Sequence, residues 1–196
     1  MNTYLPDCYG NRQVRLVSLN HDIPTEKLLK LSNMVYAIIP DIPLKMGYLK
    51  VNIGHTLVPF GSRQKSHLFD NFGHPVNTDL QMSQDTSETM YIKALELNVK
   101  DREAGLRWEG LITAQTAYDM TTLPNKDSLD FLKLIKFNQA ELSNKMYNKV
   151  IFSHHKGRQI IGGWDYEDIK NGKYSVLDDI VNDLFRVGAI NHKLVI

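Results

Sequence analysis

Apolar residues in the first quarter of the chain recur at spacings that predict a strand, a helix and a second strand. The apolar run at 14–19 predicts the first strand. Residues three and four apart then form one apolar stripe, which favours a helix over 22–38 that ends before Pro40. The stripe consists of Leu28, Leu31, Val35 and Ile38. The segment 48–53 predicts the second strand.

The segment 54–89 has the least regular pattern of the chain. It is rich in Gly, Pro, Ser, Asn and Asp and contains only short apolar runs. Long irregular loops are uncommon within a compact domain and are usually functional or interaction elements. We therefore predict an irregular loop or arm at about 54–89 that binds a partner.

Alternating apolar and polar residues predict a β-hairpin in the middle of the chain. Its strands would be 90–99 and 106–118, joined by a polar connector that ends in glycine. In the second strand, one face would carry apolar side chains and the other polar ones, as expected of an antiparallel sheet with one wet face. Gly110 would mark a bulge or bend within this long strand.

The last third of the chain predicts a helix, a second hairpin and a final helix. Near-heptad apolar spacing favours a helix over 127–146, and the stretches 149–152 and 159–164 predict two paired strands. Apolar residues at helical spacing over 177–185 favour a helix that Gly188 ends. The last five residues would add an edge strand.

This order of elements predicts an α+β fold. Hairpins alternate with helices, so we expect a mostly antiparallel sheet with about three helices packed on one face. The length of 196 residues and the 42% hydrophobic content suit a single domain over 1–196 with a substantial core.

Composition narrows the class of protein. The 23 basic and 22 acidic residues give a net charge of +1, which argues against bulk coating of nucleic acid or anionic membrane. Cys8 is the only cysteine, so no intrachain disulfide can form. The sequence shows neither a signal-peptide pattern nor an apolar run long enough to span a membrane, which predicts a cytoplasmic location, or host cytoplasm or virion if the protein is viral.

The stretch 148–174 is the densest in potential chemistry. Two cations and a histidine surround the tip of the predicted second hairpin, with one more lysine at its start. These residues are Lys149, His155, Lys156 and Arg158. They could form a small basic spot that contacts a phosphate or an acidic partner, or a solvated hairpin tip.

A second candidate site combines residues from distant parts of the chain. Tyr166 and Lys170 are four residues apart, so on a helix they would share a face and the lysine could lower the tyrosine pKa. With His21 they would supply a base, an acid and a cation for phosphodiester cleavage without a metal. This set resembles poxins, metal-independent cyclic-dinucleotide nucleases that use an N-terminal His and a Tyr-x-x-x-Lys. The resemblance covers two short spots, and the position of Tyr166 relative to the C-terminus departs from that family.

Histidines also gather in the predicted arm. His55, His67 and His74 are spaced by 12 and 7 residues, which matches no compact metal-binding motif. They would instead hydrogen-bond within the arm or face solvent. We therefore predict neither a metal nor a cofactor.

Two functions remain open from the sequence. The favoured one is a non-enzymatic assembly or adaptor subunit, such as a component of a virus or phage particle or another large complex, that forms homo-oligomers or hetero-complexes through the 54–89 arm. Its motivations are the absence of catalytic motifs, the long arm and the balanced charge. The alternative is a small metal-independent phosphodiesterase or nuclease that acts on a nucleotide or cyclic nucleotide through His21, Tyr166 and Lys170.

Overall fold

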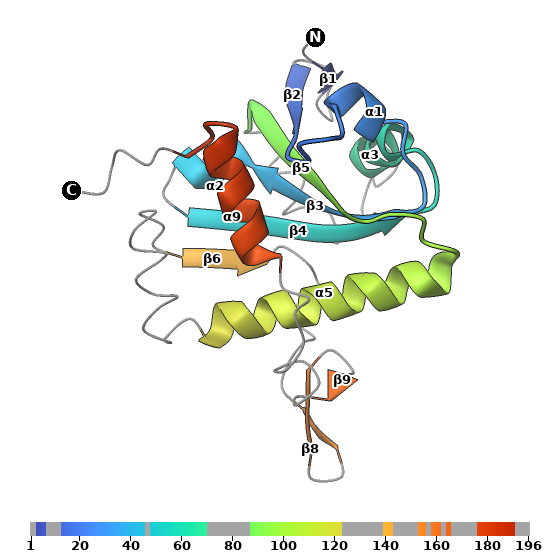
Figure 1. Ribbon diagram of the computed structural model, residues 1–196, viewed down its shortest axis with the longest axis vertical. Helices are drawn as coiled ribbons and strands as arrows, with labels where there is room; N and C mark the ends of the chain where they lie inside the picture. The colour runs from blue at the N-terminus through green and yellow to red at the C-terminus, as the bar shows by residue number, and fades with distance from the viewer. Residues whose placement is uncertain are drawn as a thin grey trace, which may run out of the picture.

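The computed structural model combines an open six-stranded sheet with helices and a small second sheet (Figure 1). It describes residues 3–6, 13–45, 48–69, 87–122, 139–142, 153–155, 158–161, 164–165 and 176–190. The larger sheet consists of β1 (Thr3–Pro6), β2 (Gln13–Ser18), β3 (Met34–Pro40), β4 (Tyr48–Thr56), β5 (Thr89–Glu96) and β6 (Gln139–Leu142). The helices are α1 (Thr25–Leu28), α2 (Asp41–Lys45), α3 (Phe60–Phe69), α5 (Arg102–Thr122) and α9 (Leu177–Arg186).

The larger sheet has the strand order β1-β2-β5-β3-β4-β6. Strand β3 pairs antiparallel with both β4 and β5, and β1 pairs antiparallel with β2. The β2–β5 and β4–β6 pairs are parallel. The mixed α/β content and the mostly antiparallel sheet confirm the coarse prediction from the sequence.

Strand β3 is the centre of the core, and it corrects the predicted helix over 22–38. All seven of its residues are buried, whereas the helical part of that region is only the short α1. Asn33 has a positive φ of 55°, which separates α1 from the strand. Periodicity alone cannot separate a continuous apolar run in a helix from a strand that is buried on both faces. The β-branched and aromatic residues of this run favour the strand.

Helices cover both faces of the sheet, so the prediction of helices on one face is wrong. Alternate residues of β3 point to opposite sides, and they join two different apolar clusters. Val35, Ala37 and Ile39 pack with α9 and part of α5, whereas Met34, Tyr36 and Ile38 pack with α1 and with Phe60 of α3. The chain therefore buries β3 as the middle of three layers.

Helix α5 replaces the second strand of the predicted central hairpin. It packs on β3, β4 and β6 and runs along the β4 side of the sheet (Figure 1). Its buried positions recur at helical spacing, but most of them are small or polar. They are Gly105, Gly110, Ile112, Thr113, Gln115 and Thr116. Because most of these residues are small or polar, the hydrophobicity pattern does not reveal the buried face of α5. The alternation of apolar and polar residues along the same segment resembles that of a strand.

Other predictions have mixed outcomes. Strands β2, β4 and β5 and helix α9 confirm four predicted elements, and Gly188 has the expected positive φ of 73° just after α9. The predicted arm is not irregular throughout, since it contains the end of β4 and the helix α3, while residues 70–86 lie outside the described residues. Residues 139–142 form β6 rather than helix, and the rest of the predicted 127–146 helix lies outside the described residues.

The smaller sheet contains β7 (Ser153–His155), β8 (Arg158–Ile161) and β9 (Trp164–Asp165), all antiparallel. Its first hairpin turns between His155 and Arg158, as the sequence predicts. The predicted strand at 149–152 and the final edge strand lie outside the described residues.

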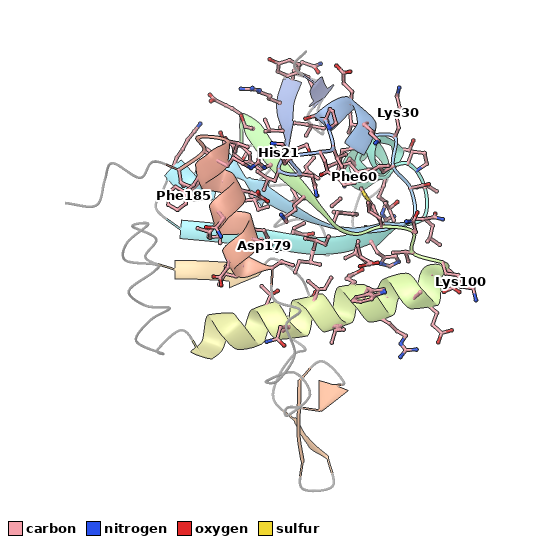
Figure 2. All side chains as sticks on the ribbon, viewed as in Figure 1. His21, Lys30, Phe60, Lys100, Asp179 and Phe185 are labelled. Carbon is pink, nitrogen blue, oxygen red and sulfur yellow. The ribbon has the colours of Figure 1, made fainter. Side chains whose placement is uncertain are left out.

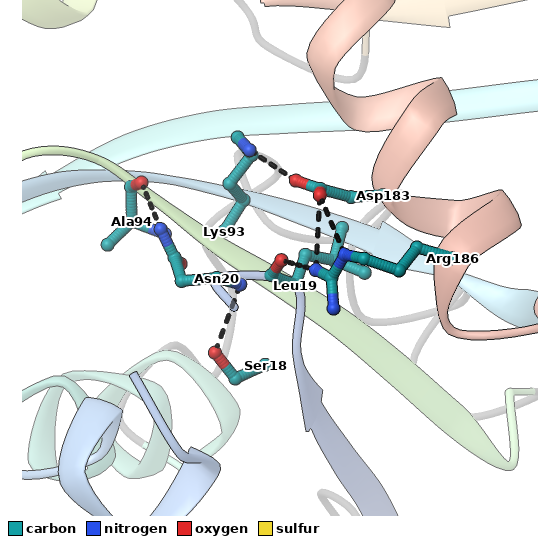
Figure 3. Close-up of polar contacts among 7 residues, drawn as sticks. All are labelled: Ser18, Leu19, Asn20, Lys93, Ala94, Asp183 and Arg186. Carbon is teal, nitrogen blue, oxygen red and sulfur yellow. Dashed lines mark hydrogen bonds and ion pairs between the residues drawn. The ribbon is translucent and has the colours of Figure 1, made fainter. Parts of the chain in front are cut away.

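Polar contacts fasten α9 to the sheet (Figure 3). Lys93 of β5 pairs with Asp183 of α9, and both side chains are mostly buried. Arg186 donates to the Leu19 carbonyl and also contacts Asp183, 3.1 Å from its Oδ1. Asp183 thus links two cations that come from the sheet and from its own helix.

We expect Asp183→Asn to lower the free energy of unfolding by about 1–3 kcal/mol, because it removes the charge that both cations share. Urea denaturation of the purified variant measures this change. Asp179→Asn is the matched control, since Asp179 lies on the same helix and is exposed (Figure 2). Equal effects of the two substitutions would show that the buried pair contributes nothing specific.

Candidate functional site

Tyr36 and Arg63 form the first half of a polar cluster beside β4. The Tyr36 ring is buried in the core and packs edge-on against Phe60, with ring centroids 4.8 Å apart. Arg63 lies one helical turn after Phe60 on α3, and its guanidinium hydrogen-bonds the Tyr36 hydroxyl. Its neighbour Gln64 is also buried, and its side-chain amide donates to the same Tyr36 hydroxyl.

Gly54 makes room for the Tyr36 hydroxyl. The two residues are direct partners across β3 and β4. A Cβ at position 54 would lie 2.9 Å from the hydroxyl oxygen, which is closer than real carbon atoms approach. The glycine therefore allows the hydroxyl to reach over the backbone of β4.

His55 and Glu109 form the second half of the cluster. The Nδ1 of His55, on β4, bonds the Oε2 of Glu109, on α5, and each side chain is 17% exposed. A histidine whose Nδ1–H donates to a carboxylate keeps Nε2 free to accept a proton, which is the arrangement of a positioned general base. The pair is partly shielded from water but still reachable.

The two halves lie on opposite faces of the sheet, since Tyr36 pairs with Gly54 and His55 with Val35, and only the charge of Glu109 acts from one half on the other. Burial raises the pKa of Tyr36 to about 12, the positive charge of Arg63 opposes this rise, and the negative charge of Glu109 adds to it. Glu109 therefore acts on Tyr36 as well as on His55. Tyr36 stays protonated at neutral pH and can serve as a hydrogen-bond or proton donor. One face of the sheet thus offers a neutral acid and a cation, Tyr36 and Arg63, and the other offers a base and its orienting carboxylate, His55 and Glu109.

We expect stability to fall as the pH rises from 10 towards 12, because the unfolded chain ionises Tyr36 first. The stabilising contribution is fully present below pH 10 and is lost as the pH passes through the folded pKa of about 12. Its size is on the order of 2–3 kcal/mol. Denaturant unfolding of the wild type and Tyr36→Phe, each at pH 9 and near pH 12, isolates the effect. Tyr4→Phe is the control, since Tyr4 is 46% exposed, and a loss that persists unchanged in Tyr36→Phe would contradict the assignment.

Gly105 lets α5 approach His55. A Cβ at this position would lie 2.6 Å from the His55 Cδ2, so an alanine must displace the ring or the helix. We expect Gly105→Ala to cost about 1–3 kcal/mol through overpacking and to misplace the base. Gly61→Ala in α3 is the control, because its Cβ would come no closer than 3.4 Å to any atom. Thermal denaturation compares the two, and an unchanged melting temperature in Gly105→Ala would contradict the close contact.

The residues predicted from the sequence contribute little to this cluster. His21 is exposed at the turn after β2 (Figure 2), and its proposed partners Tyr166 and Lys170 lie outside the described residues. His155 and Arg158 are paired in register on β7 and β8, while Lys149 and Lys156 lie outside the described residues. The three-residue site and the basic spot therefore stay predictions.

Neither a metal cluster nor a membrane span is found in the part of the chain that the structure describes. No three side chains among His, Cys, Asp and Glu there come together in a way that could hold a metal ion. None of the helices within these ranges is both long enough and apolar enough to cross a bilayer. No protein-family model, curated protein or solved structure matches the chain.

The sequence contains weak signals for this cluster. His55 was visible as one of three histidines in the predicted arm, but its partner Glu109 is 54 residues away, on a segment that the pattern assigned to a strand. Tyr36 and Arg63 do not stand out, because each lies among residues that have ordinary structural roles. Only the pairing of β3 with β4 and the docking of α3 and α5 bring them together.

Proposed function

We propose that the chain is a phosphodiesterase or nuclease whose site is the cluster Tyr36, His55, Arg63 and Glu109. The observation that carries the proposal is the His55–Glu109 pair on one face of β4, with the Tyr36–Arg63 pair on the opposite face of the same sheet. Arginine matches the geometry and charge of a phosphate group.

These groups supply the parts of a hydrolytic reaction. His55 would take the proton of a water molecule through Nε2 while Glu109 holds the imidazole. The water oxygen attacks phosphorus, and the bond from phosphorus to the leaving oxygen breaks. Tyr36 would donate a proton to that leaving oxygen, and Arg63 would stabilise the charge on the phosphoryl oxygens.

The test is turnover by the purified protein on bis(p-nitrophenyl) phosphate, a cyclic dinucleotide, and single- and double-stranded DNA oligonucleotides. We expect cleavage of at least one substrate and a loss of about 100-fold or more in Arg63→Met. The exposed Arg102, at the start of α5, provides a matched control as Arg102→Met. Failure of every substrate, or equal activity of Arg63→Met and the wild type, would contradict the proposal.

The same assay in EDTA and in Mg²⁺ decides whether protein side chains or a metal ion neutralise the charge of the phosphate group. Activity that survives EDTA supports a metal-free mechanism, as in the alternative function considered from the sequence. Activity that requires Mg²⁺ would assign Glu109 a different role, because Mg²⁺ is commonly held by one or two carboxylates together with substrate phosphates.

The assembly or adaptor role is a second candidate, favoured by one observation in the predicted arm. Leu57 and Val58 follow β4 directly and are 38% and 50% exposed. Adjacent exposed apolar side chains suit a protein contact. Light scattering over a concentration series tests this role. A defined oligomer that Leu57→Ser with Val58→Ser disperses would support it, and a monomer at every concentration would contradict self-assembly.

A further inference from the structure

A pocket on α5 lies next in sequence to the Glu109 end of the proposed site. Its volume is about 380 Å³, within the range of roughly 300–1,000 Å³ that is typical of small-molecule sites. The described residues that line it are Asp101, Glu103, Ala104, Arg107, Trp108 and Leu111. Trp108 immediately precedes Glu109, but consecutive helical residues do not face each other, so the pocket and the His55 contact use different sides of α5.

The pocket has an apolar wall and a polar rim. Ala104, Trp108 and Leu111 are four and three residues apart, so they share one face of α5. The rim contains two carboxylates, from Asp101 and Glu103, and one guanidinium, from Arg107. Its formal charge is negative, which disfavours a second phosphate here.

A neutral planar group with polar edges fits this arrangement. An indole offers a stacking surface, carboxylates accept from amino groups, and a guanidinium donates to ring nitrogens or carbonyls. One Asp101 oxygen already accepts the Ala104 N–H at 2.9 Å, which fixes that carboxylate at the start of the helix. Stacking of bases on aromatic side chains is a general mode of nucleotide binding that needs no sequence motif.

We propose that this pocket is a nucleobase subsite, in which Trp108 stacks on a base of the substrate. The inference rests on the proposed function for the identity of its ligand. It goes further by assigning the base contact to α5 and by separating base recognition from phosphate recognition.

Tryptophan fluorescence tests the subsite directly. The chain has two tryptophans, so Trp164→Phe leaves Trp108 as the only one. In this background we titrate adenosine, adenosine 5′-monophosphate and ribose 5-phosphate. We expect saturable quenching or a spectral shift with both adenine compounds and none with ribose 5-phosphate. The absence of a saturable change with adenosine and its monophosphate would overturn the inference.

Two variants confirm the location of binding. Ala104→Met fills the pocket with a residue that favours helix, and we expect the fluorescence response to disappear. Arg107→Met removes an exposed rim cation without a packing change, and we expect the apparent Kd for adenosine to rise about tenfold, equivalent to one lost polar contact. An unchanged response in either folded variant would overturn the inference, and Arg107→Met alone decides if Ala104→Met fails to fold.

The fluorescence and hydrolysis measurements together distinguish this inference from the proposed function. In Arg63→Met, hydrolysis should be lost while adenosine still quenches Trp108. A wild type that binds adenosine but cleaves no phosphodiester would overturn the proposed function and leave the subsite intact. A wild type that cleaves substrates without any adenosine response would do the reverse.

Discussion

His55→Gln should lower the rate of phosphodiester cleavage by about 10²- to 10⁴-fold, the usual contribution of a positioned general base. Glutamine keeps a polar side chain of similar reach but cannot accept and release a proton as imidazole does. The rate under single-turnover conditions measures the loss, and circular dichroism checks that the fold is retained. Because His55 is partly exposed, we expect the variant to remain folded.

His21→Gln is the matched control for this experiment. His21 is exposed, and it is also the histidine that the sequence favours as the catalytic base. We expect its substitution to leave the rate within a factor of two of the wild type. A loss in His21→Gln with full activity in His55→Gln would transfer the site to the residues predicted from the sequence.

Phe60→Ala should destabilise the protein by about 3–5 kcal/mol. Phe60 is completely buried, and its ring packs against Tyr36 beneath α3 (Figure 2). The substitution leaves a cavity between the helix and the sheet and loosens the helix that carries Arg63. Urea denaturation measures the stability, and the cleavage assay reports the loss of Arg63 positioning.

Leu57→Ala is the control for this substitution, because Leu57 lies just before α3 and is exposed. We expect its effect to stay within about 0.5 kcal/mol. A Phe60→Ala variant as stable as Leu57→Ala would contradict the packing of α3 on the sheet. A destabilised variant that cleaves substrates normally would show that Arg63 does not depend on α3 docking.

The strands of the sheet could be predicted where the pattern is local. Strand β5 alternates buried and partly exposed residues, so period two is visible in its sequence. Strand β3 could not be recognised by alternation, because both of its faces are buried and every residue is apolar. Its neighbours Leu28 and Leu31 happened to continue the same spacing, and the combination imitated a helical stripe.

Helix α5 was not predicted because its buried face carries few apolar residues. Its buried face includes Gly105, which touches a histidine ring, and Thr116, whose hydroxyl donates to the Ile112 carbonyl at 2.7 Å. Such residues contribute no hydrophobic signal, since they are chosen by close approach and local hydrogen bonding. Only the tertiary contact with β4 shows why they are there.

The polar cluster could not be predicted from the sequence, because its members are far apart along the chain. Its members come from β3, β4, α3 and α5, and none is within a recognisable motif of another. Tyr36 looks like a core residue and Glu109 like a solvated one until α5 docks and Glu109 meets His55 of β4. A site of this kind becomes visible only when strand pairing and helix docking are known.

The most direct test of the central claim is NMR of ¹⁵N-labelled protein during titration with two dinucleoside analogues that are not cleaved. One is a charged phosphorothioate, and the other is an uncharged methylphosphonate. This measurement locates binding at individual side chains, whereas turnover alone can come from a trace of another nuclease. We expect the phosphorothioate to shift the NMR signals of the His55 ring nitrogens and the Arg63 Nε. The uncharged methylphosphonate should shift them much less, and the His21 signals should stay unchanged. Shifts confined to His21, or no shift at His55 and Arg63 at saturating ligand, would contradict it.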